Sequence, residues 1–474
     1  MLICDTGSGS RIDTPTENSV TDRWGERLPR SLGPWGATAV VVGVTIGSGI
    51  FRVPATVAAQ LHAVGPAMLC WLLGGLLSLC GALSVAELGA AFPRSGGIFA
   101  YLLECYGPLP AFLYGWASLT VITPAAFGAT STIFAEYLGY FLPISPRAVH
   151  YVAALMIAVM GMINYVGLRR AAAVMNITTA AKFVAVIVLG LLAFTAVRAP
   201  AAPPPAAAPM PGPMLSLIAS ALIPVMWTYD GWSNLTFVGG EIARPQTTLP
   251  AGLILGTACV VLVYVLLNLG FWHALTATEM ARSPLVAATA AARIPSIGRA
   301  GAALIAGLVL VSTFSGLNGS MMTDPRVIYG MADRGLFFRS VARVSPRFKS
   351  PSVAIGLSAA LGCVYVLQTD FAQLADRFIL GIWPFYALCV AGVFVLRRTR
   401  PELPRPYRVW GYPVLPALFL LATFAMIGNA LITDPRDTGI TLLIIAAGLP
   451  AYAVWKRFER RAAQPQAHGR APPP

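Results

Sequence analysis

Charged residues are scarce in this sequence. Asp, Glu, Lys and Arg make up 11% of the 474 residues, whereas 57% are hydrophobic and the mean hydropathy is +0.71. Soluble domains carry about 25% charged residues, so this composition excludes an ordinary soluble domain and favours a membrane protein. The net charge of +14 lies in short clusters between apolar runs. That pattern is typical of signals that orient membrane spans, and we expect no nucleic-acid partner.

Motifs for catalysis and metal binding are absent from the sequence as well. It contains no P-loop, nucleophile elbow, zincin motif or recognisable pair of catalytic carboxylates, so we expect no enzyme activity and no cofactor. No CxxC spacing occurs, and most cysteines lie inside apolar runs, which indicates neither disulfides nor a metal site. The seven are Cys4, Cys70, Cys80, Cys105, Cys259, Cys363 and Cys389.

Twelve apolar runs are candidates to cross a bilayer, which takes about 20 mostly apolar residues. They cover residues 36–61, 66–91, 108–137, 148–167, 174–197, 214–240, 251–273, 300–323, 351–368, 378–396, 413–431 and 439–455. Clusters of proline, glycine and charge separate them. The sequence therefore predicts an all-α integral membrane protein with 12 transmembrane helices.

Lys and Arg concentrate in both tails and in alternate loops between the spans. Under the positive-inside rule this bias places both termini in the cytoplasm of a multi-pass cell-membrane protein. No apolar segment typical of a cleavable signal peptide occurs in the polar N-terminal tail. The expected segments are the tail 1–34, spans one to five at 35–197, an extracytoplasmic Ala/Pro-rich linker at 198–213, spans six to ten at 214–397, spans 11 and 12 at 398–457, and the tail 458–474.

The first span, GATAVVVGVTIGSGIFRVPATVAAQ, contains Gly47-Ser48-Gly49 at its middle, where helix propensity is poor. Unpaired backbone at that depth is tolerated only if it is buried in protein or lines a cavity. Close helix packing by small residues is the competing interpretation, and Pro54 just after the glycines favours true unwinding. The break is therefore a candidate ligand site.

A broken helix offers opposite charges on its two sides. The N–H groups that begin the second half-helix, from Ser48 to Ile50, suit a carboxylate. The carbonyls that end the first half-helix, near Thr45 and Ile46, suit an ammonium group. This pair of poles fits the backbone of an amino acid.

Span six contains a second interruption, Tyr229-Asp230-Gly231-Trp232-Ser233-Asn234. Spans one and six are five apart, which gives them opposite orientations and predicts a 5+5 inverted repeat with discontinuous helices 1 and 6. Trp227 lies near mid-depth, where an interfacial aromatic belt does not reach, so Trp227, Thr228 and Tyr229 are candidate pocket residues. Asp230 could hold a cationic substrate, pair with a basic residue or cap the second half-helix, and we favour the structural role.

Three further residues inside spans are candidates for coupling or gating. Lys182 stands in the apolar run of span five, where a functional role and snorkelling to the interface are equally supported. Ser312 and Ser315 in span eight could line a cavity, although such hydroxyls also bond locally within helices. Arg52 follows the break in span one, and Glu87 and Glu241 lie near the cytoplasmic ends of spans two and six. For all three, interface or gate contacts are favoured over substrate binding.

Four longer motifs follow one another along the chain: GVTIGSGIFRVP, SVAELGAAFPRSGGIFAYLLECYGPLPAFLYGW, WTYDGWSNLTFVGGEIARPQTTLP, and DPRVIYGMADRGLFF with VSPRFKSP. In this order they resemble the amino acid-polyamine-organocation superfamily, in particular its L-type amino acid transporter branch. The resemblance covers roughly residues 35–455. It implies the 5+5 fold with two additional helices, working by alternating access.

The resemblance also implies roles for particular residues. The substrate amino group would meet carbonyls of Thr45, Ile46, Trp227 and Asp230, and the carboxylate would meet the Gly47-Ser48-Gly49 segment. Trp227 would cover the substrate, and it is bulkier than the Phe of many relatives. Lys182 resembles the span-five lysine that replaces a sodium ion in sodium-independent members.

The expected function is therefore secondary active transport of amino acids, with neutral L-amino acids favoured, by sodium-independent exchange or proton symport. Cationic amino acids or polyamines are the alternative substrates, and a non-transporting amino acid sensor is the alternative class. The loop GYFLPISPRAVH lacks the cysteine through which heterodimeric animal members join a glycoprotein. We therefore expect membrane lipid and the amino acid substrate as partners, together with protons if the mechanism is symport. We expect no disulfide-linked heavy chain.

Overall fold

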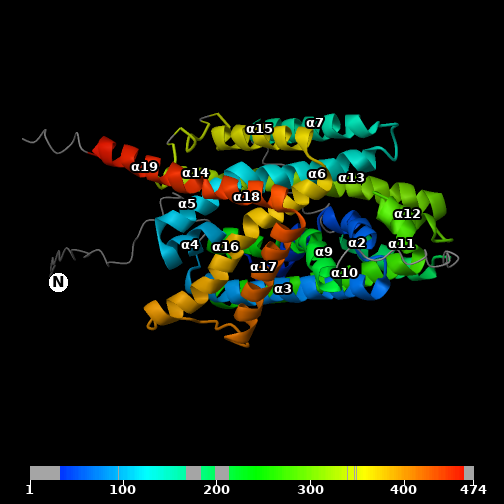
Figure 1. Ribbon diagram of the computed structural model, residues 1–474, viewed down its shortest axis with the longest axis horizontal. Coiled ribbons are helices and arrows are strands. Elements are labelled where there is room, and N and C mark those ends of the chain that lie inside the picture. The colour runs from blue at the N-terminus through cyan, green and yellow to red at the C-terminus, as the bar shows by residue number, and fades with distance from the viewer. Residues whose placement is uncertain are drawn as a thin grey trace, which may run out of the picture.

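The computed structural model describes residues 32–93, 96–166, 183–197, 213–338, 340–345, 347–348 and 350–463. These residues are almost entirely helical (Figure 1). No β-strand occurs among them, and their one β-bridge joins Leu32 to Ile242. Lys182 and most of the predicted linker and tails lie outside the described residues.

Eight helical segments of the described chain are long and apolar enough to cross a membrane. They are Val64–Ala91, Pro108–Leu138, Pro146–Val166, Pro245–Ala274, Gly298–Asp333, Phe371–Thr399, Val414–Thr433 and Pro435–Phe458. Shorter apolar helices occupy Pro34–Thr45, Gly97–Tyr106, Phe183–Thr195, Met214–Tyr229 and Ser352–Gln368. The expectation of an all-α, multi-pass membrane protein is confirmed.

The helices of the first half follow the predicted spans closely. They are α1 (Pro34–Thr45), η1 (Gly49–Phe51), α2 (Val53–Leu61), α3 (Val64–Ala91), α4 (Gly97–Tyr106), α5 (Pro108–Ala117), the π-helical turn η2 (Ser118–Ile122), α6 (Thr123–Leu138), α7 (Pro146–Val166) and η3 (Ala193–Thr195). The π-turn joins α5 to α6 in one long rod and was not foreseen from the sequence.

The helices of the second half are also close to the predicted runs. They are α9 (Met214–Tyr229), η4 (Trp232–Glu241), α10 (Pro245–Ala274), α11 (Ala277–Arg282), α12 (Val286–Ala292), α13 (Gly298–Thr323), α14 (Pro325–Asp333), α15 (Ser352–Gln368), α16 (Phe371–Thr399), α17 (Val414–Thr433), α18 (Pro435–Ala446) and α19 (Gly448–Ala463). Short helices such as α11 and α12 connect the longer ones.

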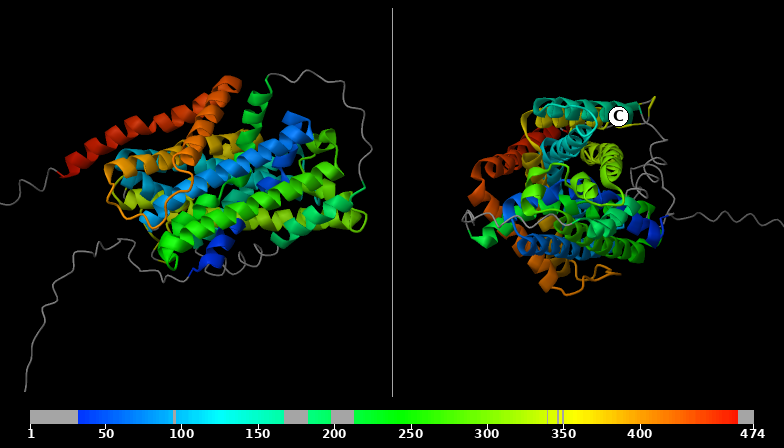
Figure 2. Two further views of the ribbon diagram at one scale, coloured as in Figure 1. Left: turned by 90° about the horizontal axis from the view of Figure 1, so that it is seen from below. Right: turned by 90° about the vertical axis from the view of Figure 1, so that its right-hand side faces the viewer.

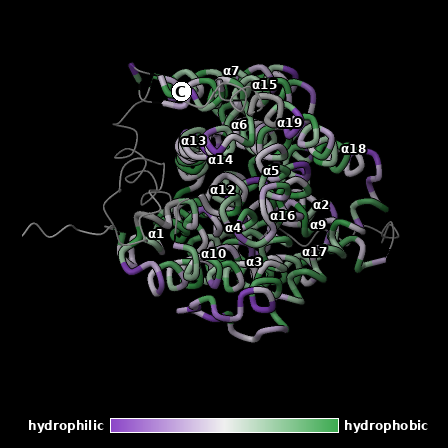
Figure 3. The backbone as a smooth tube through the Cα atoms, turned by 90° about the vertical axis from the view of Figure 1, so that its left-hand side faces the viewer, coloured by the Kyte–Doolittle hydropathy of each residue, from purple (hydrophilic) through white to green (hydrophobic). Residues whose placement is uncertain are grey.

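The bundle has two outer faces with the broken helices between them. α3 and α10 lie side by side on one face, and α7 and α15 pack together on the opposite face (Figures 1 and 2). Seen along the helices, the trace is coloured as hydrophobic residues over most of the outside of the bundle (Figure 3). Leu262 on α10 and Leu304 on α13 are more than 70% exposed. An apolar surface of this kind suits lipid, and it would be a liability in water.

Small residues let α10 approach its neighbours closely. A Cβ atom at Gly256 would lie 2.6 Å from Val41 of α1, and one at Gly75 of α3 would lie 2.7 Å from Val261. Membrane helices pack through such small residues because lipid supplies no hydrophobic drive for association. α10 therefore holds α1 and α3 in a fixed register beside the breaks.

Candidate functional site

The first span is broken where the sequence predicts. α1 ends at Thr45, and the 3-10 turn η1 begins at Gly49. The backbone N–H groups of Ser48, Gly49 and Ile50 donate no hydrogen bond to the described residues, although all three residues are buried. Buried unpaired N–H groups are rare and costly, so three in succession are donors open to an acceptor from outside the described chain.

The second break lies between Tyr229, the last residue of α9, and Trp232, the first residue of η4. Gly231 between them has φ +116°, a conformation that residues with a side chain rarely adopt. The half-helix after this break differs from the expected α-helix, because Trp232–Glu241 is a 3-10 helix. Its tighter winding leaves a different set of N–H groups facing the break.

The two breaks are in direct contact. A Cβ atom at Gly49 would lie 2.8 Å from Thr228 Oγ1 and 2.8 Å from Trp227 Cζ3. In return, a Cβ atom at Gly231 would lie 3.0 Å from the backbone nitrogen and Cα of Thr45. Each break thus packs against the last turn of the other broken helix. Residues 45–50 can contact residues 227–231 this closely because each break contains a glycine.

Tyr264 of α10 connects the two helix ends, and sequence reasoning missed it. Its hydroxyl lies 2.7 Å from the carbonyl oxygen of Thr45 and 3.1 Å from that of Thr228. The side chain is fully buried. A tyrosine in an apolar span resembles any other core aromatic, so no local signal marks this contact.

Asp230 has a different partner from the one expected for a helix cap. Its side chain makes no capping bond, and Oδ1 accepts a hydrogen bond of 2.7 Å from the hydroxyl of Tyr386 on α16. The Ser233 hydroxyl lies 2.9 Å from the same Tyr386 oxygen and donates to it, because the tyrosine proton is directed to Asp230. The structure gives Asp230 a tertiary partner, and no capping bond from its side chain occurs within the described residues. The partner lies 156 residues away in sequence, where no capping pattern reveals it.

One cluster of residues closes the α2 side of the breaks. We call Arg52, Glu136, Phe371 and Trp227 the Arg52 cluster. Arg52 Nε donates to Glu136 Oε2 of α6 at 2.9 Å, and its guanidinium lies 5.1 Å from the centre of the Phe371 ring. The Trp227 ring meets Phe371 edge-on at 5.3 Å. Trp227 thus connects the second break to this cluster, in keeping with the expected gate contacts of Arg52.

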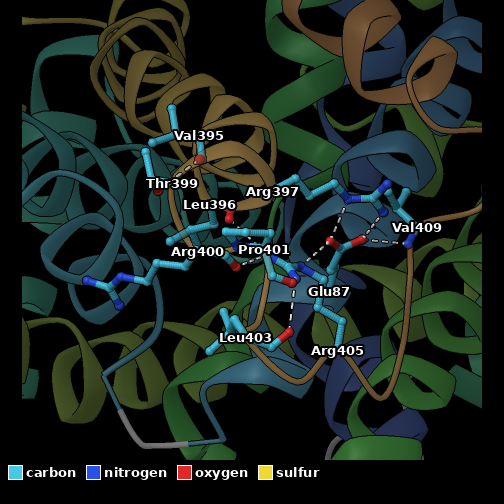
Figure 4. Close-up of polar contacts among 10 residues, drawn as sticks. All are labelled: Glu87, Val395, Leu396, Arg397, Thr399, Arg400, Pro401, Leu403, Arg405 and Val409. Carbon is cyan, nitrogen blue, oxygen red and sulfur yellow. Dashed lines mark hydrogen bonds and ion pairs between the residues drawn. The ribbon is translucent and has the colours of Figure 1, made fainter.

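A second cluster closes the other end of the bundle. We call Glu87, Arg397, Arg405 and Val409 the Glu87 cluster (Figure 4). Arg397 donates to both oxygens of Glu87, at 2.9 and 2.6 Å, and the Val409 N–H donates at 2.8 Å. Arg405 Nε lies 3.6 Å from the same carboxylate, and its other nitrogens donate to backbone carbonyls such as Leu396 O. The contacts tie the end of α3 to the last turn of α16 and to the segment between α16 and α17.

The remaining predicted coupling residues are placed in part. Ser312 and Ser315 are buried on α13, and the Ser312 hydroxyl has no hydrogen-bond partner in the described chain. Lys182 cannot be set beside them, because it lies outside the described residues. No group of His, Cys, Asp and Glu within the described part of the chain is arranged to hold a metal ion.

A polar cavity of about 160 Å³ lies apart from the two breaks, where α2, α9, α16, α17 and α18 meet. Its charged and amide lining comprises Gln60, Gln373, Asp376, Arg377, Asp434 and Asp437. Arg377 pairs with Asp437 at 3.4 Å, and Gln373 donates to the same carboxylate. Because neither break contributes to its wall, we do not regard it as the predicted backbone site.

The fold and the paired breaks define a class: helical membrane proteins with a polar centre between two discontinuous helices. The family profile described as amino acid permease matches residues 32–450, and the chain belongs to this family, within the amino acid-polyamine-organocation superfamily and related to its L-type branch.

Several relatives match this chain along most of its length. The serine/threonine exchanger SteT of Bacillus subtilis (strain 168) is 32% identical over 444 residues, which cover 91% of this chain and 98% of the relative. The human b(0,+)-type amino acid transporter 1 is 32% identical over 464 residues, 96% of this chain and 94% of the relative. The human cystine/glutamate transporter is 29% identical over 442 residues, 92% and 87% of the two chains.

Proposed function

We propose that this protein is a secondary transporter of amino acids that holds the substrate backbone between its two helix breaks. The observation that carries the proposal is the contact of the breaks, Gly49 against Thr228 and Gly231 against Thr45. The unpaired N–H groups of residues 48–50 receive the substrate carboxylate. Carbonyls of Thr45, Ile46, Trp227 and Asp230 receive its ammonium group.

Neutral L-amino acids are the proposed substrates. The Asp230 carboxylate already accepts the Tyr386 hydroxyl, which supports a structural role over a salt bridge with a cationic substrate. The Bacillus relative is named for serine and threonine, two neutral amino acids. Cationic amino acids or polyamines are the competing class, and they would need Asp230 as their counter-ion.

The proposed architecture has 12 spans, arranged as a 5+5 inverted repeat with two additional helices and both termini in the cytoplasm. The reciprocal contacts of the breaks support the repeat, because a two-fold relation produces such contacts in pairs. Alternating access then moves the half-helices around a shared central site. Ser312, Ser315 and Lys182 are the proposed coupling residues.

Exchange or proton symport without sodium is the proposed mode, and a relative named as an exchanger favours exchange. The loop between α6 and α7 contains no cysteine. We therefore propose that the chain works without a disulfide-linked heavy chain. We also propose that it has no enzyme activity.

Uptake into proteoliposomes tests the proposal. Purified protein is reconstituted with an internal pool of unlabelled amino acid, and entry of radiolabelled serine is followed while each standard amino acid competes from outside. We expect saturable counterflow inhibited by several neutral amino acids. Saturable binding without uptake or counterflow would instead identify a sensor.

The substrate class is tested at Asp230. If Asp230→Asn abolished uptake of arginine or putrescine, and neutral amino acids never competed in the unmodified protein, the neutral assignment would be wrong. We expect the opposite: competition by neutral amino acids in the unmodified protein. A defect of Asp230→Asn should then be shared by all substrates, because it arises from the lost Tyr386 contact.

A further inference from the structure

The loop between α16 and α17 lies at the edge of the bundle beyond α3 (Figure 1). Its Trp410 is 68% exposed, although the residues around it are held in place. The Val409 N–H donates to the buried Glu87 carboxylate at 2.8 Å. On the other side of the tryptophan, the Arg397 guanidinium lies 3.8 Å from the centre of the Tyr412 ring. A fixed and exposed indole is typical of the interface between lipid and water.

The adjoining helix α17 gives the depth of this indole in a bilayer. The buried residues of α17 face the bundle, whereas Val414, Leu421 and Phe424 on its outer side are each 67% or 68% exposed. The 20 residues of α17 span about 30 Å, which is the thickness of the hydrocarbon layer. Val414 is the first residue of the helix, so the exposed apolar stripe ends at the hydrocarbon boundary. Trp410 precedes that boundary and therefore lies at the level of the headgroups.

Two arginines without a partner lie at the same end of the bundle. Arg397 and Val409 meet on the Glu87 carboxylate. Their sequence neighbours Arg398 and Arg408 are thereby brought to one end of the bundle. Both arginines are exposed, and neither makes an ion pair or a hydrogen bond within the described chain. A guanidinium binds phosphate through two parallel N–H donors, and each basic residue near an anionic bilayer surface adds attraction.

We propose that Trp410, Arg398 and Arg408 form a binding surface for anionic phospholipid headgroups, in the leaflet at the Glu87 end of the bundle. The guanidiniums bind the phosphate, and the indole packs beside the glycerol backbone. The occupant is a lipid rather than free phosphate because the exposed stripe of α17 leads directly to Trp410. Since Val409 is bonded to Glu87, lipid bound here also stabilises the loop that completes the Glu87 cluster. The surface lies outside the two breaks and takes no part in substrate recognition.

Quenching of tryptophan fluorescence by brominated phospholipid measures which lipid lies beside Trp410. The unmodified protein and Trp410→Phe are each reconstituted with brominated phosphatidylglycerol or brominated phosphatidylcholine. The difference between the two proteins is the quenching of Trp410 itself. We expect the anionic lipid to be preferred by about 25-fold, with about fivefold from each arginine.

The arginine variants and a matched control test the source of this preference. Arg398→Gln and Arg408→Gln should each reduce the preference about fivefold, and the double variant should abolish it. High salt should also weaken it, because exposed charges are screened. The control is Arg436→Gln, which removes an exposed arginine from α18 at the Arg52 end of the bundle. It should leave the preference at Trp410 unchanged.

The melting temperature gives a second measurement, which does not depend on the folding of Trp410→Phe. We expect the unmodified protein to melt at a higher temperature in phosphatidylcholine mixed with phosphatidylglycerol than in phosphatidylcholine alone. The double variant of Arg398 and Arg408 should show no such gain. Soluble glycerol phosphate should give no gain either, because it lacks the acyl chains that place a lipid against α17.

The outcomes decide the proposal without any measurement of transport. Equal quenching by the two lipids, or a preference that persists in the double variant, would overturn it. A gain in melting temperature from glycerol phosphate equal to that from phosphatidylglycerol would identify a site for free phosphate, and would overturn it as well. The uptake assay tests the proposed function separately, so the failure of one proposal leaves the other standing.

Discussion

Glu87 is held by three hydrogen bonds and a second ion pair, whereas Arg52 is held by one carboxylate and the face of one ring. The Glu87 carboxylate is 3% exposed, but the side chains of Arg52 and Glu136 are 20% and 17% exposed. The two clusters lie at opposite ends of α16, about 39 Å apart by helix rise between Phe371 and Arg397. The Glu87 cluster is therefore the more deeply buried and the more extensively bonded of the two.

The difference assigns the easier opening to the Arg52 end. Releasing Arg52 from Glu136 separates two side chains that are 20% and 17% exposed and can be partly hydrated, so it costs less than exposing a carboxylate from full burial. Releasing Glu87 leaves a buried carboxylate without its partners, which costs several kcal/mol. Substitutions at the centre and at each end can break or sharpen this comparison.

The largest effect is expected at the two helix breaks, which lie between the Arg52 cluster and the Glu87 cluster. Gly231→Ala introduces a Cβ at φ +116° and 3.0 Å from the Thr45 backbone, so the breaks can no longer seat. We expect uptake to fall about 100-fold, as for other displacements near 1 Å at a functional site. Gly316→Ala on α13 meets nothing within 4 Å and is the control. Normal uptake by Gly231→Ala would contradict the contact of the breaks as the basis of the site.

The second largest effect is expected at the Glu87 cluster. Glu87→Gln leaves Arg397 and Arg405 without their counter-ion and should destabilise the protein by about 3 kcal/mol, the low end of the range for a broken buried pair because Arg397 is partly exposed. Thermal unfolding in detergent measures the loss. The control Glu104→Gln removes an exposed contact with Arg400 at the same end and should change the stability little. If the two variants had the same melting temperature, the Glu87 cluster would not be the more strongly held of the two clusters.

A smaller effect is expected at the Arg52 cluster. Arg52→Gln and Glu136→Gln should each lower stability by less than Glu87→Gln does, because both partners are partly exposed, and the double variant should cost no more than the larger single loss. The two single variants should also label faster at a cysteine introduced at Ser48, because the α2 end opens more often. Additive losses in the double-mutant cycle would show that the 2.9 Å pair is not coupled.

The smallest effect is expected in the polar cavity near the Arg52 end. Asp376 is half-buried, has no ion pair or hydrogen bond within the described residues, and shares the cavity wall with Asp434 and Asp437. Asp376→Asn should therefore stabilise the protein by about 0.5 kcal/mol, by removing repulsion between like charges. Asp333→Asn on the exposed end of α14 should have no effect on the melting temperature. A destabilised Asp376→Asn would reveal a partner for this carboxylate.

The backbone of the site was predictable from the sequence because its signals are local. Glycine at 47 and 49 in the middle of an apolar run predicts a break, and the structure ends α1 at Thr45 as expected. The apolar runs likewise predict helices such as α3 and α10, since a span must satisfy its own hydrogen bonds. Local chemistry therefore fixed where the chain stops being helical.

The side-chain partners were not predictable, because they depend on packing between distant segments. Glu87 was expected at an interface, but its partners lie 310 residues and more away. The same holds for the contact of Asp230 with Tyr386 and for the hydroxyl of Tyr264 between two carbonyls. The 3-10 winding of η4 also depends on its neighbours, because Gly231 and Ser233 do not by themselves choose between two kinds of helix.

The reciprocal contacts of Gly49 with Thr228 and of Gly231 with Thr45 have a consequence for how the sequence can evolve. Because each glycine's permitted size is set by the opposite half of the chain, neither half can accumulate changes at these positions independently. An insertion or a larger residue in one break has to be accommodated by the last helical turn of the other. We therefore expect the residues at the two breaks to vary together.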